Sequence, residues 1–209
     1  LDNPTEQEYK TGMITIKVDG LKEFTDKLKL TAKELVKVTR STVDTTATAV
    51  KTLALNTAVN HYNIQKTRLQ KTSRGQGTIY VKRSTQTDLS AIITFKGGTG
   101  TKAGDRPGLH HYADKASLKR GQGIYPKVRI KKDSGWETIK GGFYQTMPNG
   151  GVGIFERIPG TRKIARRTGP GIKQIVEDKD MNAIVVRKSR EILQEKMRQA
   201  VAKVIAKRV

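Results

Sequence analysis

The chain has 209 residues, and its 41 Lys and Arg against 19 Asp and Glu give a formal net charge of +22 at pH 7. It contains no cysteine, which excludes disulfides, thiolate zinc sites and cysteine nucleophiles. No apolar run approaches the roughly 20 residues that cross a bilayer, and no signal-peptide pattern opens the chain, so we expect a soluble protein made in a cytoplasm.

The predicted elements begin after an acidic extension, residues 1–12, which precedes a single α+β domain over residues 13–209. Residues 13–18 (MITIKV) alternate apolar and polar side chains, as a strand does. From Leu21 to Thr57 apolar or Thr side chains recur every third or fourth position, which predicts one amphipathic helix with Asp19 as its cap. Asn63 is expected to cap a short helix that follows.

Antiparallel strands, a long loop and a closing helix complete the pattern. Residues 96–108 are rich in Gly and lack apolar periodicity, which predicts a mobile loop. A terminal helix is expected over about 180–209. The order of elements predicts an α+β fold in which both long helices pack on a mostly antiparallel sheet with long basic loops. Alternation predicts strands over residues 78–82, 89–95, 125–131, 139–147 and 152–158. The expected inward stripe of the terminal helix is Met181, Val185, Ile192, Met197, Val201, Val204 and Ile205.

Little in the sequence points to catalysis. In GGTGTKAG, residues 97–104, Thr101 stands before the Lys where a phosphate-binding loop needs Gly. His110 and His111 are adjacent rather than one helical turn apart, and only Asp105 and Asp114 lie near them in the sequence. We therefore expect no enzymatic activity, no metal and no cofactor.

The positive charge, in contrast, is concentrated in segments without acids, and interspersed glycines let backbone amides approach an anion. No helix-turn-helix, zinc finger or aromatic stacking platform is visible, so we expect salt-sensitive phosphate contacts rather than base reading. The cations expected to make these contacts are Arg162, Lys163, Arg166, Arg167, Lys173, Lys127, Arg129, Lys131, Lys66 and Arg68.

The segment after residue 158 is expected to present its cations on a loop. A buried strand over residues 152–158 is followed by Pro159-Gly160, which turns the chain out of the sheet. Ile164 is the expected apolar anchor, while Arg162, Lys163, Arg166 and Arg167 stay exposed. Gly169-Pro170-Gly171 is expected to fix the return, Pro170 by restricting φ and the glycines by permitting positive φ.

Residues 143–175, FYQTMPNGGVGIFERIPGTRKIARRTGPGIKQI, resemble the signature region of the minor tail protein Z family, the tail-completion proteins of tailed bacteriophages. Residues 61–69 (HYNIQKTRL) are similar to the short Y-N-I-x-K helix of that family. The chain departs from the pattern at Gly171, where the family usually has a small hydroxyl residue, and in its cationic link TRKIARR. The matching positions are Phe143, Gly153, Phe155, Arg157, Ile164, Gly169, Pro170 and Ile172.

The resemblance implies a structural virion protein, made in the host cytoplasm, that completes the head-proximal end of the tail and joins it to the DNA-filled head. The implied partners are tail terminator, tail tube or connector subunits, phage DNA in the channel and further copies of the chain in a ring, with no membrane. Two alternatives stay open from the residues themselves. An RNA-binding structural protein, such as a ribosomal component, fits the isoelectric point of about 10.3 but not the long Thr-rich helix. A histidine-dependent nuclease would need a metal-binding carboxylate beside the histidines.

Overall fold

The computed structural model describes residues 9–10, 12–18, 31–70, 78–96, 106–118, 125–148 and 150–206, and the chain forms two compact units. Unit 1 consists of Leu1–Ala54, Ile79–Phe95 and Val176–Val209, and unit 2 of Leu55–Thr78 and Lys96–Ile175. All strand pairs among the described residues are antiparallel. The predicted α+β class is confirmed, although the strands divide into three sheets rather than one.

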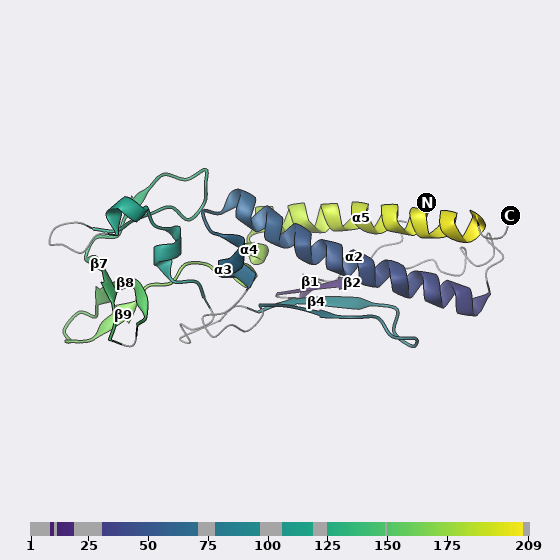
Figure 1. The fold of residues 1–209 in the computed structure, drawn as a ribbon, viewed down its shortest axis with the longest axis horizontal. Helices are drawn as coiled ribbons and strands as arrows, with labels where there is room; N and C mark the ends of the chain where they lie inside the picture. The colour runs from purple at the N-terminus through teal and green to yellow at the C-terminus, as the bar shows by residue number, and fades with distance from the viewer. Residues whose placement is uncertain are drawn as a thin grey trace. The chain divides into compact units, whose positions relative to one another are not determined.

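The sheet of unit 1 has four strands in the order β1-β2-β4-β3 (Figure 1). They are β1 (Tyr9–Lys10), β2 (Met13–Ile16), β3 (Ile79–Lys82) and β4 (Ala91–Phe95). Ile14 lies opposite Ile93 and Ile16 opposite Ala91, and these four side chains are buried. Because alternate residues point to opposite faces, this register gathers the apolar side chains of β2 and β4 on one face.

Helix α2 (Ala32–His61) begins with a capping box. The backbone N–H of Thr31 donates to Glu34 Oε2 at 2.9 Å, and the backbone N–H of Glu34 donates to Thr31 Oγ1 at 3.3 Å. These bonds satisfy donors that have no partner within the first helical turn. The predicted helix therefore does not run unbroken through Thr31, where the capping box begins α2, and its part over residues 21–30 lies outside the described residues. Asp19, the predicted cap, lies outside the described residues.

The predicted stripe is buried along α2 of unit 1, at Thr39, Val43, Thr46 and Val50. This spacing of three and four residues keeps one face of the helix inward despite the low helix propensity of Thr. Figure 1 shows α2 and α5 (Lys179–Ala206) running along the same side of the four-stranded sheet. The prediction that both long helices pack on a sheet is confirmed.

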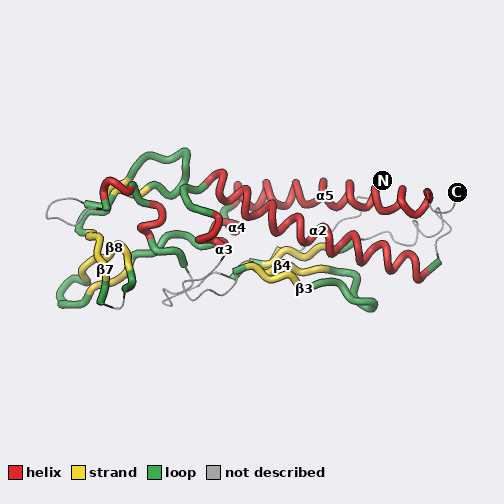
Figure 2. The backbone as a smooth tube through the Cα atoms, in the orientation of Figure 1, coloured by secondary structure: helices red, strands yellow, loops and turns green. Residues whose placement is uncertain are grey.

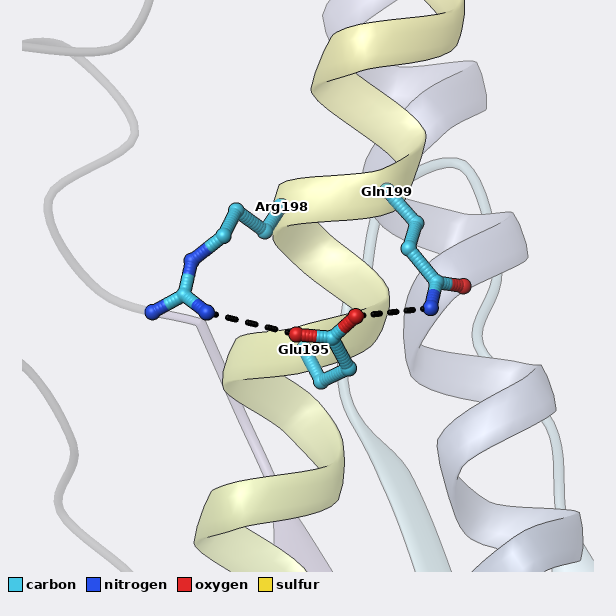
Figure 3. A network of polar contacts seen from close by, with 3 residues as sticks. All are labelled: Glu195, Arg198 and Gln199. Atoms are coloured by element: carbon cyan, nitrogen blue, oxygen red, sulfur yellow. Dashed lines mark hydrogen bonds and ion pairs between the residues drawn. The ribbon is translucent and has the colours of Figure 1, made fainter.

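Helix α5 buries a side chain at every fourth position along its first five turns. Of the expected stripe, Ile192 is only half-buried and Ile205 is 48% exposed. On the exposed face Glu195 accepts from Arg198 Nη1 at 3.3 Å and from Gln199 Nε2 at 2.8 Å (Figure 3). Such pairs three and four residues apart each contribute roughly 0.2–0.5 kcal/mol to helix stability. The side chains buried by α5 are Met181, Val185, Ser189, Leu193 and Met197.

Unit 2 contains two small sheets and several short helices (Figure 2). Its strands are β5 (Lys127–Val128), β6 (Glu137–Thr138), β7 (Gly142–Thr146), β8 (Val152–Arg157) and β9 (Ile164–Arg166). Its helices are α3 (Lys66–Gln70), η2 (Leu109–Tyr112) and η3 (Lys115–Ser117), and α4 (Ile172–Glu177) begins in this unit. Leu109, Val128 and Ile154 form a buried cluster, against which Ile139 and Tyr144 pack.

Three expectations for unit 2 need correction. The strand predicted over residues 125–131 is reduced to β5. Asn63 is too far from α3, which begins at Lys66, to cap it, and its side chain donates to the Tyr112 carbonyl at 3.3 Å instead. Residues 97–105 of the predicted mobile loop lie outside the described residues. The end of that loop is ordered, since Gly108 pairs with Thr168 as a β-bridge.

Candidate nucleic-acid interface

The cations that the sequence singled out share one property: all of them lie in unit 2. Their individual surroundings differ, and these differences decide which of them remain available to an anion. Four come from the β8–β9 region, three from β5 and the residues after it, two from α3 and one from α4.

Arg162 and Lys163 lie at the tip of the β8–β9 hairpin and are exposed. Gly160 has φ +72°, a value that favours glycine, and forms the predicted turn with Pro159. The backbone N–H of Ile158 donates to the Lys163 carbonyl at 3.0 Å. The Thr161 hydroxyl donates to the Ile158 carbonyl and accepts from the Lys163 N–H, both at 3.1 Å. The tip is therefore held in shape while its two cations stay exposed.

Arg166 is not on an exposed loop, contrary to the expectation. It belongs to β9 and lies opposite Phe155 of β8, and its side chain is half-buried. Its Nη2 donates to the Val152 carbonyl at 3.1 Å, and a Cβ on Gly153 would lie 3.1 Å from its Nε. Strand pairing thus places Arg166 across Gly153, which leaves room for it, and makes it part of the fold.

Arg167 has an acidic partner. Its Nη1 lies 3.3 Å from Glu156 Oε2, and the two side chains are 52% and 40% exposed. An exposed pair of this kind contributes roughly 0–1 kcal/mol. Arg167 therefore offers less free charge to a ligand than the hairpin tip does.

His110 and His111 form a half-buried pair next to arginines. Their ring centroids are 3.9 Å apart. Burial lowers the pKa of His110 to about 4, with Arg166 and Arg68 contributing. Burial also lowers the pKa of His111 to about 4, with His110, Arg68 and Arg166 contributing. The fold therefore brings Arg68 of α3 and Arg166 of β9 to the same histidine pair, which is neutral at pH 7.

The cations of and after β5 lie beside aromatic rings. The Arg129 guanidinium is 4.8 Å from the centre of the Trp136 ring, and Lys131 Nζ is 5.8 Å from that of Tyr62. Lys127 is exposed on β5. Trp136 was not predicted from the sequence, because only the pairing of β5 with β6 brings it opposite Arg129.

The three remaining candidates lie on the short helices α3 and α4. Lys66 Nζ donates to Asn56 Oδ1 at 2.8 Å, Arg68 is exposed on α3, and Lys173 is half-buried on α4.

A cavity of about 430 Å³ opens beside this region, lined by Arg106, Arg167 and Thr168 with Val128 and Ile139 among its apolar walls. Glu137 also lines it. Arg106 was not predicted from the sequence, because its position beside the cavity depends on the pairing of Gly108 with Thr168.

Neither a metal site nor a membrane span is found in the part of the chain that the structure describes. There, no three His, Asp or Glu side chains come together in a way that could hold a metal ion. None of the helices described combines the length and the apolarity needed to cross a bilayer.

Comparison with known proteins gives one match. The model of the family described as prophage minor tail protein Z (GPZ) matches residues 17–208. No curated protein and no solved structure matches the chain. The family match covers the two long helices, strands β3 to β9 and the signature region at residues 143–175, whereas β1 and β2 precede it. The chain therefore belongs to the prophage minor tail protein Z family, and is a minor tail protein of a bacteriophage.

Proposed function

We propose that this minor tail protein completes the tail at its head-proximal end, joins it to the DNA-filled head, and contacts DNA phosphates through unit 2. Family membership supports the place in the tail. It also favours this reading over a ribosomal component or a nuclease. The net charge of +22 supports a polyanionic partner.

The observation that carries the DNA contact is the β8–β9 hairpin tip. Arg162 and Lys163 are exposed on a turn whose backbone is fixed by hydrogen bonds. Rigid placement lowers the ordering cost of binding, and paired cations at a protruding turn suit phosphates without reading bases. Lys127 and Arg68 are further exposed cations of the same unit.

Assembly into a ring is the second part of the proposal. The last turns of α5 leave apolar side chains uncovered: Ile205 is 48% exposed and Val201 and Val204 are half-buried. In a closed ring, most simply six-fold, a second copy of the chain would cover these side chains. Particle imaging with a tag on this protein tests both parts: a ring of density at the head–tail joint is expected. Labelling at the distal tail tip would contradict the proposal.

A matched pair of variants tests the DNA contact. Arg162→Gln/Lys163→Gln removes the hairpin-tip cations, and Arg187→Gln/Lys188→Gln removes an exposed Arg-Lys pair from α5 of unit 1, with the same change in net charge. Duplex DNA affinity is measured against salt concentration. We expect the hairpin variant to bind more weakly, with a salt slope reduced by up to about 0.9 for each phosphate that the protein no longer neutralises. Equal slopes in the two variants would show that net charge alone drives binding.

A further inference from the structure

The second feature of unit 2 that could bind a nucleic acid is the outward face of the β5–β6 pair. Lys127 lies opposite Thr138, and Val128 lies opposite Glu137. The backbone N–H of Ile139 donates to the Pro126 carbonyl at 2.9 Å, which continues the pairing by one position. Because residues alternate between faces, one set of side chains points away from the core. We call this set the ribbon face: Tyr125, Lys127, Arg129, Trp136, Thr138 and Lys140.

Burial follows this division except at two positions: Arg129 is half-buried on the ribbon face, and Glu137 is exposed on the other face. Pro126 and Val128 are buried and Ile139 packs on the core cluster, whereas Lys127 and Lys140 are exposed. Two large aromatic side chains of the ribbon face are also exposed, Tyr125 by 49% and Trp136 by 46%. About half of each aromatic side chain is therefore open to solvent beside the cations of the same face, which leaves ring surface available to a ligand.

The charges of the ribbon face all have one sign. Lys127, Arg129 and Lys140 are cationic, whereas Glu137, which is exposed, belongs to the other face of the β5–β6 pair and lines the cavity. Two further acids lie nearby: Asp133 is exposed in the turn between β5 and β6, and Asp114 Oδ1 accepts from the backbone N–H of Ala116 at 3.1 Å. The Arg129 guanidinium lies 4.8 Å from the centre of the Trp136 ring, which fixes the ring by a cation–π contact.

We propose that the ribbon face binds single-stranded nucleic acid by stacking unpaired bases on Tyr125 and Trp136 while its cations contact the phosphates. Four strand positions separate the two aromatics along the ribbon, about 13 Å at the rise of an extended strand. That distance suits a short run of unpaired nucleotides whose backbone passes Lys127. Bases in a duplex are stacked on one another and cannot offer their faces in this way. Aromatic platforms beside cationic grooves bind single strands with little sequence preference.

Binding at the ribbon face depends neither on the location of the protein in the tail nor on the hairpin tip. Trp136 is the only tryptophan of the chain, so the intrinsic tryptophan emission of the full-length protein reports on the ribbon face alone. Tyr80, 44% exposed on β3 of unit 1, provides a matched aromatic control. The probes are oligothymidylate, a duplex of the same length, and polyglutamate, which carries negative charge but no bases.

We expect oligothymidylate to quench Trp136 emission, and polyglutamate to leave it unchanged. Tyr125→Ala should weaken binding of labelled oligothymidylate roughly five- to a hundredfold, the range that removal of one stacked base gives. The affinity for the duplex should not change in this variant. Tyr125→Phe should retain single-strand binding, and Tyr80→Ala should behave as wild type. Thermal melts confirm that each variant is folded.

Two results would overturn the proposal. One is saturating oligothymidylate that leaves Trp136 emission unaltered, with equal single-strand affinity in Tyr125→Ala, Trp136→Phe and Tyr80→Ala. The other is quenching by polyglutamate equal to that by oligothymidylate, which would make the ribbon face a site for an acidic protein. In the hairpin variant Arg162→Gln/Lys163→Gln the quenching by oligothymidylate should persist, so failure of one proposal is distinguishable from failure of the other.

Discussion

The Tyr112 ring lies directly against Gly169, and its hydroxyl donates a hydrogen bond to the carbonyl of Pro170. A Cβ on Gly169 would lie 2.2 Å from a carbon of that ring. Burial raises the pKa of Tyr112 well above its usual range, so the hydroxyl stays protonated and can donate. Gly169 and Pro170 of the signature region therefore form the surface against which the buried Tyr112 ring packs. Gly169 is needed for close approach and not, as the sequence predicts, for positive φ, because it is not among the positive-φ glycines.

Gly169→Ala should destabilise the protein. The added methyl group must displace the buried Tyr112 ring, and overpacking of this kind costs typically about 1–3 kcal/mol. Gly135→Ala is the control, since no atom lies within 4 Å of a Cβ at that position. Denaturant unfolding measures both variants. Equal stability of the two would mean that the Tyr112 ring moves aside at no cost.

Thr31→Ala should lower stability by about 0.5–2 kcal/mol, because it removes the side chain that caps α2. Thr48→Ala, at an exposed position within the same helix, should be neutral or slightly stabilising, since Ala has the higher helix propensity. Far-UV circular dichroism during thermal unfolding compares them. If the cap did not stabilise α2, Thr31→Ala would be at least as stable as Thr48→Ala.

Lowering the pH from about 6.5 to about 4 should destabilise the folded chain. The pKa of His110 and of His111 is about 4 in the fold, below the ordinary value of 6.5. In that window the unfolded chain takes up protons that the folded chain does not, so the free energy of unfolding falls as the pH falls. Above about pH 6.5 both histidines are neutral in the folded and the unfolded chain, so they add nothing to the pH dependence of the free energy of unfolding.

Histidine resonances followed by NMR give both pKa values directly. In His110→Gln/His111→Gln the fall in melting temperature across this pH window should be smaller than in the wild type. An unchanged slope would assign the pH dependence to other groups.

Arg166→Gln should lower the free energy of unfolding more than Arg162→Gln does, although both remove one positive charge. Loss of the Arg166 side chain leaves the Val152 carbonyl without its donor, at a cost of about 1–3 kcal/mol. Arg162 is exposed at the hairpin tip, so its replacement should change stability by less than about 0.5 kcal/mol. Equilibrium unfolding in urea resolves the difference, and a stable Arg166→Gln variant would restore the exposed-loop interpretation.

The purified protein should leave DNA and RNA intact in the presence of magnesium, manganese or zinc. His110 and His111 are the residues to test, because they are the clustered imidazoles of the chain. Gel analysis after long incubation is the measurement. Cleavage that is reproducible and lost in His110→Ala/His111→Ala would contradict a purely structural role.

Local patterns in the sequence predicted the elements that have a strong period. The stripe of α2 from Thr39 to Val50 and the alternation of β2 and β4 follow from side-chain periodicity, and the structure has both. The first residue of α2 was predicted less well. A Thr that caps a helix and a Thr within a helical stripe look alike in the sequence until the hydrogen bonds of Thr31 are known.

The candidate site depended on contacts between distant segments. β9 was missed because Ile164–Arg166 is too short and too charged to show alternation, and it forms only because β8 pairs with it. Trp136 and Tyr125 share a face only through the register of β5 with β6. The sequence could supply the cations, but it could not show which of them the fold uses for itself.

The β8–β9 hairpin separates residues that make the fold from residues that face outward. Phe155 of β8 and Arg166 of β9 lie opposite each other in the paired strands. The side chains of Arg162 and Lys163 take no part in the pairing of β8 with β9. Tip residues can therefore change over generations without a penalty in folding, as exposed turn residues generally do. Under the proposed DNA contact, single substitutions at positions 162 and 163 would let related phages change the affinity for DNA and its salt dependence without changing the fold.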